Sequence, residues 1–336
     1  MTGSDITLPE LSVRLAALPG TGTKVAITSH IRPDGDAIGA TLGLYHLLTD
    51  HGIDASIVGL GPIPDRYKFL TQTIDLHRPD QLDPAHFGYL IVLDTGSIDR
   101  APEFVPAWTT RVPTINIDHH PTNTKFGTSN CVLPKASAVA EIITQMADHA
   151  DWQISAAAAT ALWVGIITDT GRFAYSCTTS ATLQAAALVL ASGINTPEID
   201  QRVFQSTSAG ALRLQARAIN NMQLLQNERV AIITLAQQDF HECGASTEDA
   251  EEIINLPRRL DSVEIALAMT EMAESTPENP RTKASFRTKP PFDAGSFCQA
   301  LGGGGHARAA GCELPKPLAD ATEQILQNIL EAWFSS

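Results

Sequence analysis

Residues 112–120 read Val112-Pro113-Thr114-Ile115-Asn116-Ile117-Asp118-His119-His120, an apolar run that ends in an acid and two adjacent histidines. Three other apolar segments also end in carboxylate or imidazole side chains. They lead to His30, Asp34 and Asp36, to Asp94, and to Asp169. Converging carboxylates repel one another and are costly to bury, so we expect a cation to hold them together. The pattern therefore points to a metal centre.

Short β-like runs alternate with helical stretches through the first half of the chain. We expect strands at 24–29, 55–60, 89–93 and 111–117, and helices at 36–50, 137–149 and 155–168. This alternation predicts a parallel sheet that is covered on both faces and binds ligands beyond the carboxyl ends of its strands. Asp169 would follow a helix, whereas most of the other candidate side chains follow strands.

Helices are expected at 181–192 and 208–225, and a domain boundary near 223–228. A second set of elements then begins, with strands at 229–235, 263–269 and 284–288 and helices at 248–255, 294–301 and 318–334. The sequence thus predicts an N-terminal domain over residues 1–222, which includes the connecting helices, and a smaller C-terminal α/β domain over residues 223–336.

The composition suits a globular protein of two ordinary domains. The chain has 336 residues, of which 43% are hydrophobic and 18% charged. No run approaches the roughly 20 apolar residues that span a membrane, and the N-terminus lacks the pattern of a signal peptide. The five cysteines are scattered and form no C-x-x-C motif. We therefore expect a cytoplasmic protein with reduced thiols.

The formal net charge of −14 limits the possible partners. Proteins that grip long duplex nucleic acid present basic surfaces, because neutralising phosphates supplies most of the affinity. The acidic balance therefore argues against long duplexes. A small anionic substrate that is bound through metals and a few local cations remains compatible.

Each acidic cluster also allows a simpler interpretation when it is taken alone. Asp36 could cap the N-terminus of a helix, and His30 and Asp94 could merely end strands. The adjacent histidines His119 and His120 are harder to explain in this way, because buried and unpaired imidazoles are costly. The acid before them could orient one of the two rings.

The chain resembles the DHH phosphoesterase superfamily, in the subgroup with a C-terminal DHHA1 domain. The resemblance rests on five motifs in family order: HIRPDGDAIG at 30–39, VLDTG at 92–96, IDHH at 117–120, GIITDTGRF at 165–173 and GGGGHARAAG at 302–311. Length and spacing are similar to those of the bifunctional oligoribonucleases and 3′-phosphoadenosine 5′-phosphate (pAp) phosphatases, or nanoRNases. This resemblance implies a Rossmann-like parallel-sheet DHH domain, a DHHA1 domain, and an active site in the cleft between them.

The resemblance also implies two metal ions that share Asp94 as a bridging ligand. The remaining ligands would be His30 and Asp34 for one ion, and Asp36, His119 and Asp169 for the other. Imidazole and carboxylate ligands without thiolate favour Mn²⁺, with Mg²⁺ or Co²⁺ as alternatives. The catalytic set would add His120, which contacts the scissile phosphate, and Asp118, which orients a histidine.

Substrate binding is expected from several further residues. Gly302 to Gly305 could form a nest of backbone N–H groups for an anion, although a flexible surface loop is the alternative. The resemblance assigns a phosphate or base contact to Arg287. The next residue is Thr288, where the family commonly has Ser. Pro290 and Pro291 could also shift the local loop. The full expected set is His120, Arg172, Arg287, Gly303, Gly304, Gly305 and His306.

Other cations have an ordinary interpretation. Arg172 could form a salt bridge, and Arg258, Arg259, Lys283 and Lys289 could be solvated surface groups.

The resulting hypothesis is a two-metal phosphodiesterase and phosphatase, of the oligoribonuclease and 3′(2′),5′-bisphosphate nucleotidase type. A hydroxide that bridges the metals would cleave short oligoribonucleotides to mononucleotides, and pAp to AMP. The partners would be short RNA or nucleotide bisphosphates, without long duplexes or membranes, and the protein would be a monomer or homodimer. Two alternatives remain: a phosphodiesterase for linear or cyclic dinucleotide signals (pGpG, pApA, cyclic di-AMP), and a non-catalytic nucleotide-binding protein.

Overall fold

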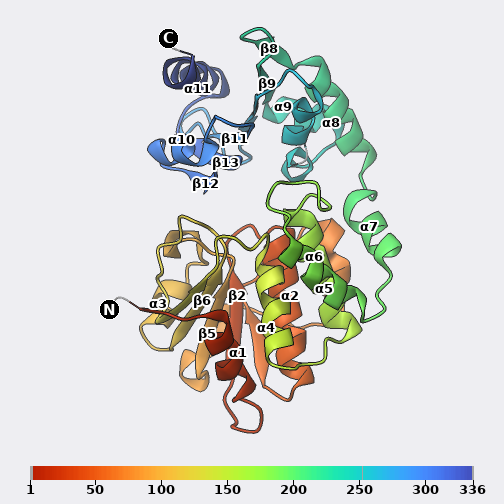
Figure 1. Cartoon of the computed structure of the whole chain (residues 1–336). Helices are drawn as coiled ribbons and strands as arrows, with labels where there is room; N and C mark the ends of the chain where they lie inside the picture. The colour runs from red at the N-terminus through yellow and green to blue at the C-terminus, as the bar shows by residue number, and fades with distance from the viewer. Residues whose placement is uncertain (1–2, 252, 335–336) are drawn as a thin grey trace. The chain divides into compact units, whose positions relative to one another are not determined.

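The computed structural model describes residues 3–251 and 253–334, and it divides into two compact units, Met1–Ser206 and Thr207–Ser336 (Figure 1). Each unit has a sheet and a hydrophobic core of its own. Among the described residues, no helix combines the length and the apolar character needed to cross a bilayer.

The first unit is built on a parallel sheet. In its described part, seven strands follow the order β1-β7-β6-β5-β2-β3-β4, and every pair of neighbours is parallel. Their bounds are β1 Ser4–Asp5, β2 Val25–Ser29, β3 Ala55–Val58, β4 Leu76–His77, β5 Tyr89–Leu93, β6 Thr114–Asp118 and β7 Ser129–Val132. The expected strands β2, β3, β5 and β6 and the parallel sheet are confirmed, whereas β1, β4 and β7 were not predicted.

Strands β2, β5 and β6 form the centre of this sheet. Nearly all of their residues are buried, as expected for central parallel strands that are covered on both faces. Strand β5 is almost wholly apolar, whereas β6 alternates its two isoleucines with the buried polar residues Thr114, Asn116 and Asp118. The pairing aligns Ser29 with Leu93, and Leu93 with Ile117. The residues that follow these aligned positions are His30, Asp94 and Asp118. The register therefore delivers three candidate side chains to one edge of the sheet.

Helices cover both faces of the sheet, as expected. Helices α1 Leu8–Ala16, α2 Gly35–Asp50, α4 Val139–His149 and α5 Ala156–Asp169 contribute to one core with the central strands. On the other face, α3 Val105–Thr109 buries Val105 and Trp108 against Leu90 and Val92 (Figure 1). Helices α6 Ser180–Leu190 and α7 Thr196–Phe204 complete the unit.

Helices α2 and α5 pack with their backbones in contact. A Cβ atom on Gly39 would lie 2.5 Å from the carbonyl oxygen of Ala161 and 2.6 Å from the nitrogen of Gly165. Gly35 likewise faces the side chain of Thr168. Gly35 lies in the first turn of α2, and close helix packing is what requires glycine there.

The substitution Gly39→Ala should therefore lower the free energy of unfolding by about 1–3 kcal/mol, because the backbone of α5 cannot move aside. This loss outweighs the gain of about 1 kcal/mol that alanine brings to a helix. Urea denaturation followed by circular dichroism measures the change. Gly304→Ala is the control, since a Cβ there meets nothing within 4 Å. Equal stability of Gly39→Ala and the unchanged protein would contradict the close contact.

The second unit contains a mixed sheet. In its described part, six strands follow the order β12-β13-β11-β10-β9-β8, and only β9 and β10 are parallel. The strands are β8 Gln223–Leu225, β9 Val230–Leu235, β10 Ile265–Glu271, β11 Thr282–Thr288, β12 Gly304–His306 and β13 Ala309–Leu314. The helices are α8 Ala209–Asn220, α9 Gln237–Cys243, α10 Ala294–Ala300 and α11 Leu318–Trp333. This arrangement confirms the α/β class.

Two details of this unit differ from the expectation. The helix expected over 208–225 ends at Asn220, and β8 then forms a hairpin with β9 through left-handed residues at 226–228. The helix expected near 248–255 is replaced by 3-10 turns at Thr247–Ala250 and Ile253–Asn255, while Glu252 lies outside the described residues. Leu214 of α8 packs with Ile233 of β9 in the core of this unit.

Candidate metal centre

Asp94 follows β5 and is the most constrained acid of the site. Its backbone has a φ of 49°, a left-handed conformation that residues other than glycine seldom adopt. The side chain is 3% exposed, and its Oδ1 atom has no hydrogen-bond partner in the described part of the chain. A buried carboxylate oxygen without a partner is costly, so this atom is suited to bind a cation.

Asp94 forms one group with His30 and Asp34. The Nε2 atom of His30 lies 3.5 Å from Oδ2 of Asp94 and 4.0 Å from Oδ1 of Asp34. The Nδ1 atom of His30 lies 2.8 Å from the carbonyl oxygen of Ile31, so this contact keeps Nε2 turned toward the acids. Asp34 is also the N-cap of α2 and accepts the N–H groups of Asp36 and Ala37. The capping role considered for Asp36 therefore belongs to Asp34.

Asp94 forms a second group with Asp36 and His119. Asp36 is fully buried in the first turn of α2. Its Oδ2 accepts the N–H of Val139 at 2.5 Å, and its Oδ1 accepts the N–H of Ala140 at 2.9 Å. Both N–H groups belong to the first turn of α4, so the positive end of that helix supports the carboxylate.

His119 joins the second group to Asp169, the last residue of α5. Its Nε2 atom lies 3.5 Å from Oδ1 of Asp94 and 3.3 Å from Oδ2 of Asp169. Its Nδ1 atom faces the carbonyl oxygen of Ala136 at 3.2 Å. Direct charge-assisted hydrogen bonds are shorter, at about 2.7–2.9 Å. The longer separations leave room for a shared cation between these atoms.

His120 is held by Asp118 and by two asparagines that sequence reasoning missed. Its Nδ1 atom lies 2.7 Å from Oδ1 of Asp118. Asn123 donates to Oδ2 of the same acid at 2.5 Å and to Oδ1 of Asn116 at 2.8 Å. Both oxygens of Asp118 are thus engaged in hydrogen bonds that fix the ring. The polar Asn116 inside an apolar strand was the signal that could have revealed this network.

The buried carboxylates repel one another in the absence of a cation. Burial, followed by the charge of Asp94, raises the pKa of Asp36 to about 7. Burial and the charge of Asp36 raise the pKa of Asp169 well above its usual range. A divalent cation would remove this conflict.

The neighbouring imidazoles respond in the opposite way. Burial alone would lower the pKa of His30, but the hydrogen bond and charge of Asp94, together with Asp34, raise it to about 9. The pKa of His119 is raised for the same reason, by Asp94 and Asp169. Burial alone would raise the pKa of Asp94, but the hydrogen bonds with His119 and His30 outweigh this effect and hold the pKa well below its usual range. Protonated histidines thus balance the acids when metal is absent.

Arg172 has protein partners of its own. Its guanidinium group lies 3.8 Å from Asp200 and 4.9 Å from the centre of the Phe204 ring, both on α7. The salt bridge considered as the ordinary alternative is therefore present, and a substrate contact stays a prediction.

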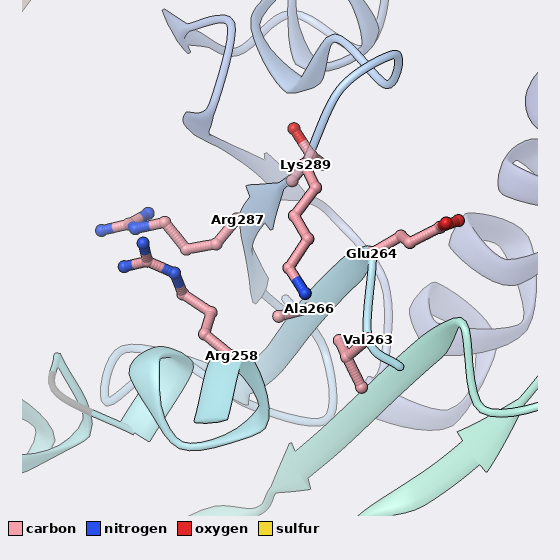
Figure 2. Close-up of a pocket in the computed structure, with 7 residues that line it drawn as sticks. Arg258, Val263, Glu264, Ala266, Arg287 and Lys289 are labelled. Carbon is pink, nitrogen blue, oxygen red and sulfur yellow. The ribbon is translucent and has the colours of Figure 1, made fainter. Parts of the chain in front are cut away.

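Arg287 lines a pocket of about 110 Å³ in the second unit, together with Arg258 and Lys289. In Figure 2 the side chains of Arg287 and Arg258 extend the same way, while the carboxylate of Glu264 points away from them. Glu264 instead pairs with Arg229 at 2.6 Å. Arg258 and Lys289, interpreted from sequence as ordinary surface cations, thus share a pocket with Arg287.

The glycine segment differs from the expected anion nest. The N–H groups of Gly302 and Gly303 donate to the carbonyl oxygens of Gln299 and Cys298 and so end α10. Gly304, Gly305 and His306 form the edge strand β12, which pairs with β13. Four consecutive N–H groups therefore do not converge on one anion, because two of them cap a helix. The substrate contacts expected from Gly303, Gly304, Gly305 and His306 stay predictions.

A parallel sheet with paired His and Asp groups beyond its strand ends, followed by a mixed-sheet unit, defines a DHH phosphoesterase. The family models agree with this class. The model of the DHH family, N-terminal domain, matches residues 24–166, and the model of the DHHA1 domain matches residues 227–336. The chain belongs to the DHH/DHHA1 family.

Several known proteins are similar to the chain over most of its length. It is 30% identical to the bifunctional oligoribonuclease and PAP phosphatase NrnA of Thermus thermophilus, over 91% of this chain and 89% of that protein. It is 28% identical to the probable bifunctional oligoribonuclease and PAP phosphatase NrnA of Streptococcus mutans, over 91% and 95%. The crystal structure of an exopolyphosphatase-related protein from Bacteroides fragilis has the same fold, with a TM-score of 0.85, 24% identity and 96% coverage of both chains.

Asp94→Asn should weaken Mn²⁺ binding by more than about 100-fold, the upper range for residues that only orient a ligand. The reason is that both ligand groups lose the same negative charge. Isothermal titration calorimetry measures the affinity. The matched control is Asp99→Asn, an exposed acid five positions further along the chain. Unchanged affinity in Asp94→Asn would disprove its shared role.

Affinity for Mn²⁺ should rise as the pH increases from about 6 to about 9, because bound ligands must first lose protons. The raised pKa values of about 9 for His30 and about 7 for Asp36 place this change in that window. Titrations in two buffers with different ionisation enthalpies would also detect the released protons. An affinity that does not depend on pH, without proton release, would contradict the charge state described above.

Proposed function

We propose that this phosphoesterase uses Mn²⁺ to hydrolyse short oligoribonucleotides to mononucleotides and to remove the 3′-phosphate from pAp. One observation carries the proposal. Asp94 belongs to three groups, with His30 and Asp34, with Asp36 and His119, and with Asp118 and His120, and the ligand atoms within each group lie within 4.8 Å of one another. We take the first two as the metal-binding groups, because His120 and Asp118 are assigned to the substrate side. Two ligand groups that share a carboxylate suit a pair of divalent ions.

The residues of the site fit such ions. Oδ1 of Asp94 is buried without a hydrogen-bond partner among the described residues, and the pKa values of Asp36 and Asp169 are raised by burial beside other acids. Oxygen and imidazole ligands without thiolate favour Mn²⁺. We assign His30 and Asp34 to one ion, and Asp36, His119 and Asp169 to the other. Such ions, when bound, activate water at neutral pH and polarise phosphoryl oxygens.

His120 would act on the substrate. Burial lowers the pKa of its ring, but the hydrogen bond and charge of Asp118 and the charge of Asp94 outweigh this effect and raise it. When it is protonated, the ring donates Nδ1–H to Asp118 and would donate Nε2–H to an oxygen of the scissile phosphate. A donor held in this position stabilises the negative charge that develops in the transition state. Asn123 contributes by fixing the acid.

Three features support a short nucleotide as the substrate. The NrnA relatives match the chain over about nine tenths of its length. The pocket with Arg258 and Arg287 offers planar guanidinium groups, which suit phosphate. The net charge of −14 disfavours long duplexes. The five free cysteines also support the proposed cytoplasmic location.

A substrate panel tests the proposal. The purified protein with Mn²⁺ should release mononucleotides from pApA and pGpG and AMP from pAp, as measured by chromatography, and should act more slowly on cyclic di-AMP. Asp94→Asn should abolish these activities, and Asp99→Asn should retain them.

Other outcomes would replace the proposal. Faster hydrolysis of cyclic di-AMP than of the linear substrates would indicate a phosphodiesterase of cyclic signals. Nucleotide binding without turnover in Mn²⁺, Mg²⁺ or Co²⁺ would indicate a binding protein.

A further inference from the structure

Glu141 is a buried carboxylate near the site that belongs to neither ligand group. It lies in the first turn of α4 and is 2% exposed. Its Oε2 atom accepts three hydrogen bonds, from the N–H of Ser137 at 2.9 Å, the hydroxyl of Ser137 at 2.7 Å and the hydroxyl of Thr182 at 2.9 Å. Gln145 donates to Oε1 at 3.0 Å. A carboxylate that is buried with so many donors holds its neighbours in one geometry.

The main target of Glu141 is a short segment that touches two of the proposed ligands. Residues 136–140 precede and begin α4, and Ser137 is the point at which Glu141 binds them. At one end of the segment, the carbonyl oxygen of Ala136 faces Nδ1 of His119. At the other end, two N–H groups bind both oxygens of Asp36. One segment thus sets the orientation of an imidazole and a carboxylate.

The start of α4 has no conventional cap. The N-cap residue is Ala138, whose side chain cannot accept a hydrogen bond. Two N–H groups of the first turn are bound by Asp36, and the backbone before the helix is fixed by Glu141. If Glu141 were removed, Ser137 would lose both hydrogen bonds to the carboxylate, at the centre of the segment. The N–H of Ala136 would still donate to the carbonyl oxygen of Leu133, and Ala138 to Ala140 would stay packed in the core, so the segment would be loosened and not released.

We propose that Glu141 is a positioning residue of the metal centre. By binding Ser137 it fixes the segment 136–140, which directs Nε2 of His119 and the carboxylate of Asp36 toward the ions. The inference rests on the proposed function, in that the site must bind divalent metal. In this assignment Glu141 is neither a metal ligand nor a substrate contact. Its effect is therefore expected in metal affinity before it is seen in turnover.

Two matched substitutions separate positioning from general stability. Ser137→Ala and Thr182→Val each remove one hydroxyl hydrogen bond to the same Oε2 atom. The first bond holds the segment, and the second holds α6. Titration with Mn²⁺, followed by the electron paramagnetic resonance signal of the free ion, measures affinity without turnover. Circular dichroism and thermal unfolding show that each variant is folded at the temperature of the titration.

We expect Glu141→Ala to weaken Mn²⁺ binding by about 10- to 100-fold, as for other residues that orient metal ligands. Ser137→Ala should weaken it several-fold, and Thr182→Val should leave it unchanged. Glu141→Gln should restore most of the affinity, because its carbonyl oxygen can accept the same three hydrogen bonds. If Glu141→Ala does not fold, the comparison of Ser137→Ala with Thr182→Val decides alone.

The result can overturn the inference without touching the proposed function. The inference is overturned if folded Glu141→Ala binds Mn²⁺ with normal affinity. If Glu141→Ala does not fold, normal affinity in Ser137→Ala overturns it. Equal losses in Ser137→Ala and Thr182→Val would also overturn it, since stability would then explain both. Failure of the unchanged protein to bind Mn²⁺ would instead refute the metal assignment under the proposed function.

Discussion

The free-energy cost of burying the charged carboxylate of Asp94 beside other acids is the constraint on which the site of the first unit depends. A carboxylate that is almost fully buried, with one oxygen lacking a hydrogen-bond partner among the described residues, lies at the end of a central strand beside other acids. The register of β2, β5 and β6 brings these side chains together, since it aligns the points at which the strands end. The free-energy cost of such a cluster is lowered by imidazole protons, by helix N–H groups and by a divalent cation.

The surrounding helices place both hydrogen-bond donors and further acids next to Asp94. The N-terminus of α4 meets Asp36, and the C-terminal residue of α5 is itself an acid. Because the backbones of α2 and α5 are in direct contact, the carboxylates of Asp36 and Asp169 come close together. Glu141, which lies outside the ligand groups, binds Ser137 in the backbone segment that contacts His119 and Asp36. The site is thus defined by backbone positions as much as by its ligands.

The strands that carry the site could be predicted, because each has buried apolar residues and is followed by residues of metal-ligand type. The short strands β1 and β4 could not, since two residues carry no pattern. Glu141 was missed because an acid in the first turn of a helix looks the same whether it faces water or Ser137. The sequence of four glycines does not reveal that the N–H groups of Gly302 and Gly303 end α10, so the shape of this segment could not be predicted.

The candidate ligands come from segments that span residues 30–169, and only the folded sheet brings them together. An unfolded chain cannot present this arrangement, so each bound ion favours the native state over the unfolded one. At a free metal concentration about 100 times the dissociation constant, one such site contributes about 2.7 kcal/mol to the free energy of unfolding. The resistance of the first unit to denaturation and proteolysis is therefore linked to the supply of divalent metal in its surroundings.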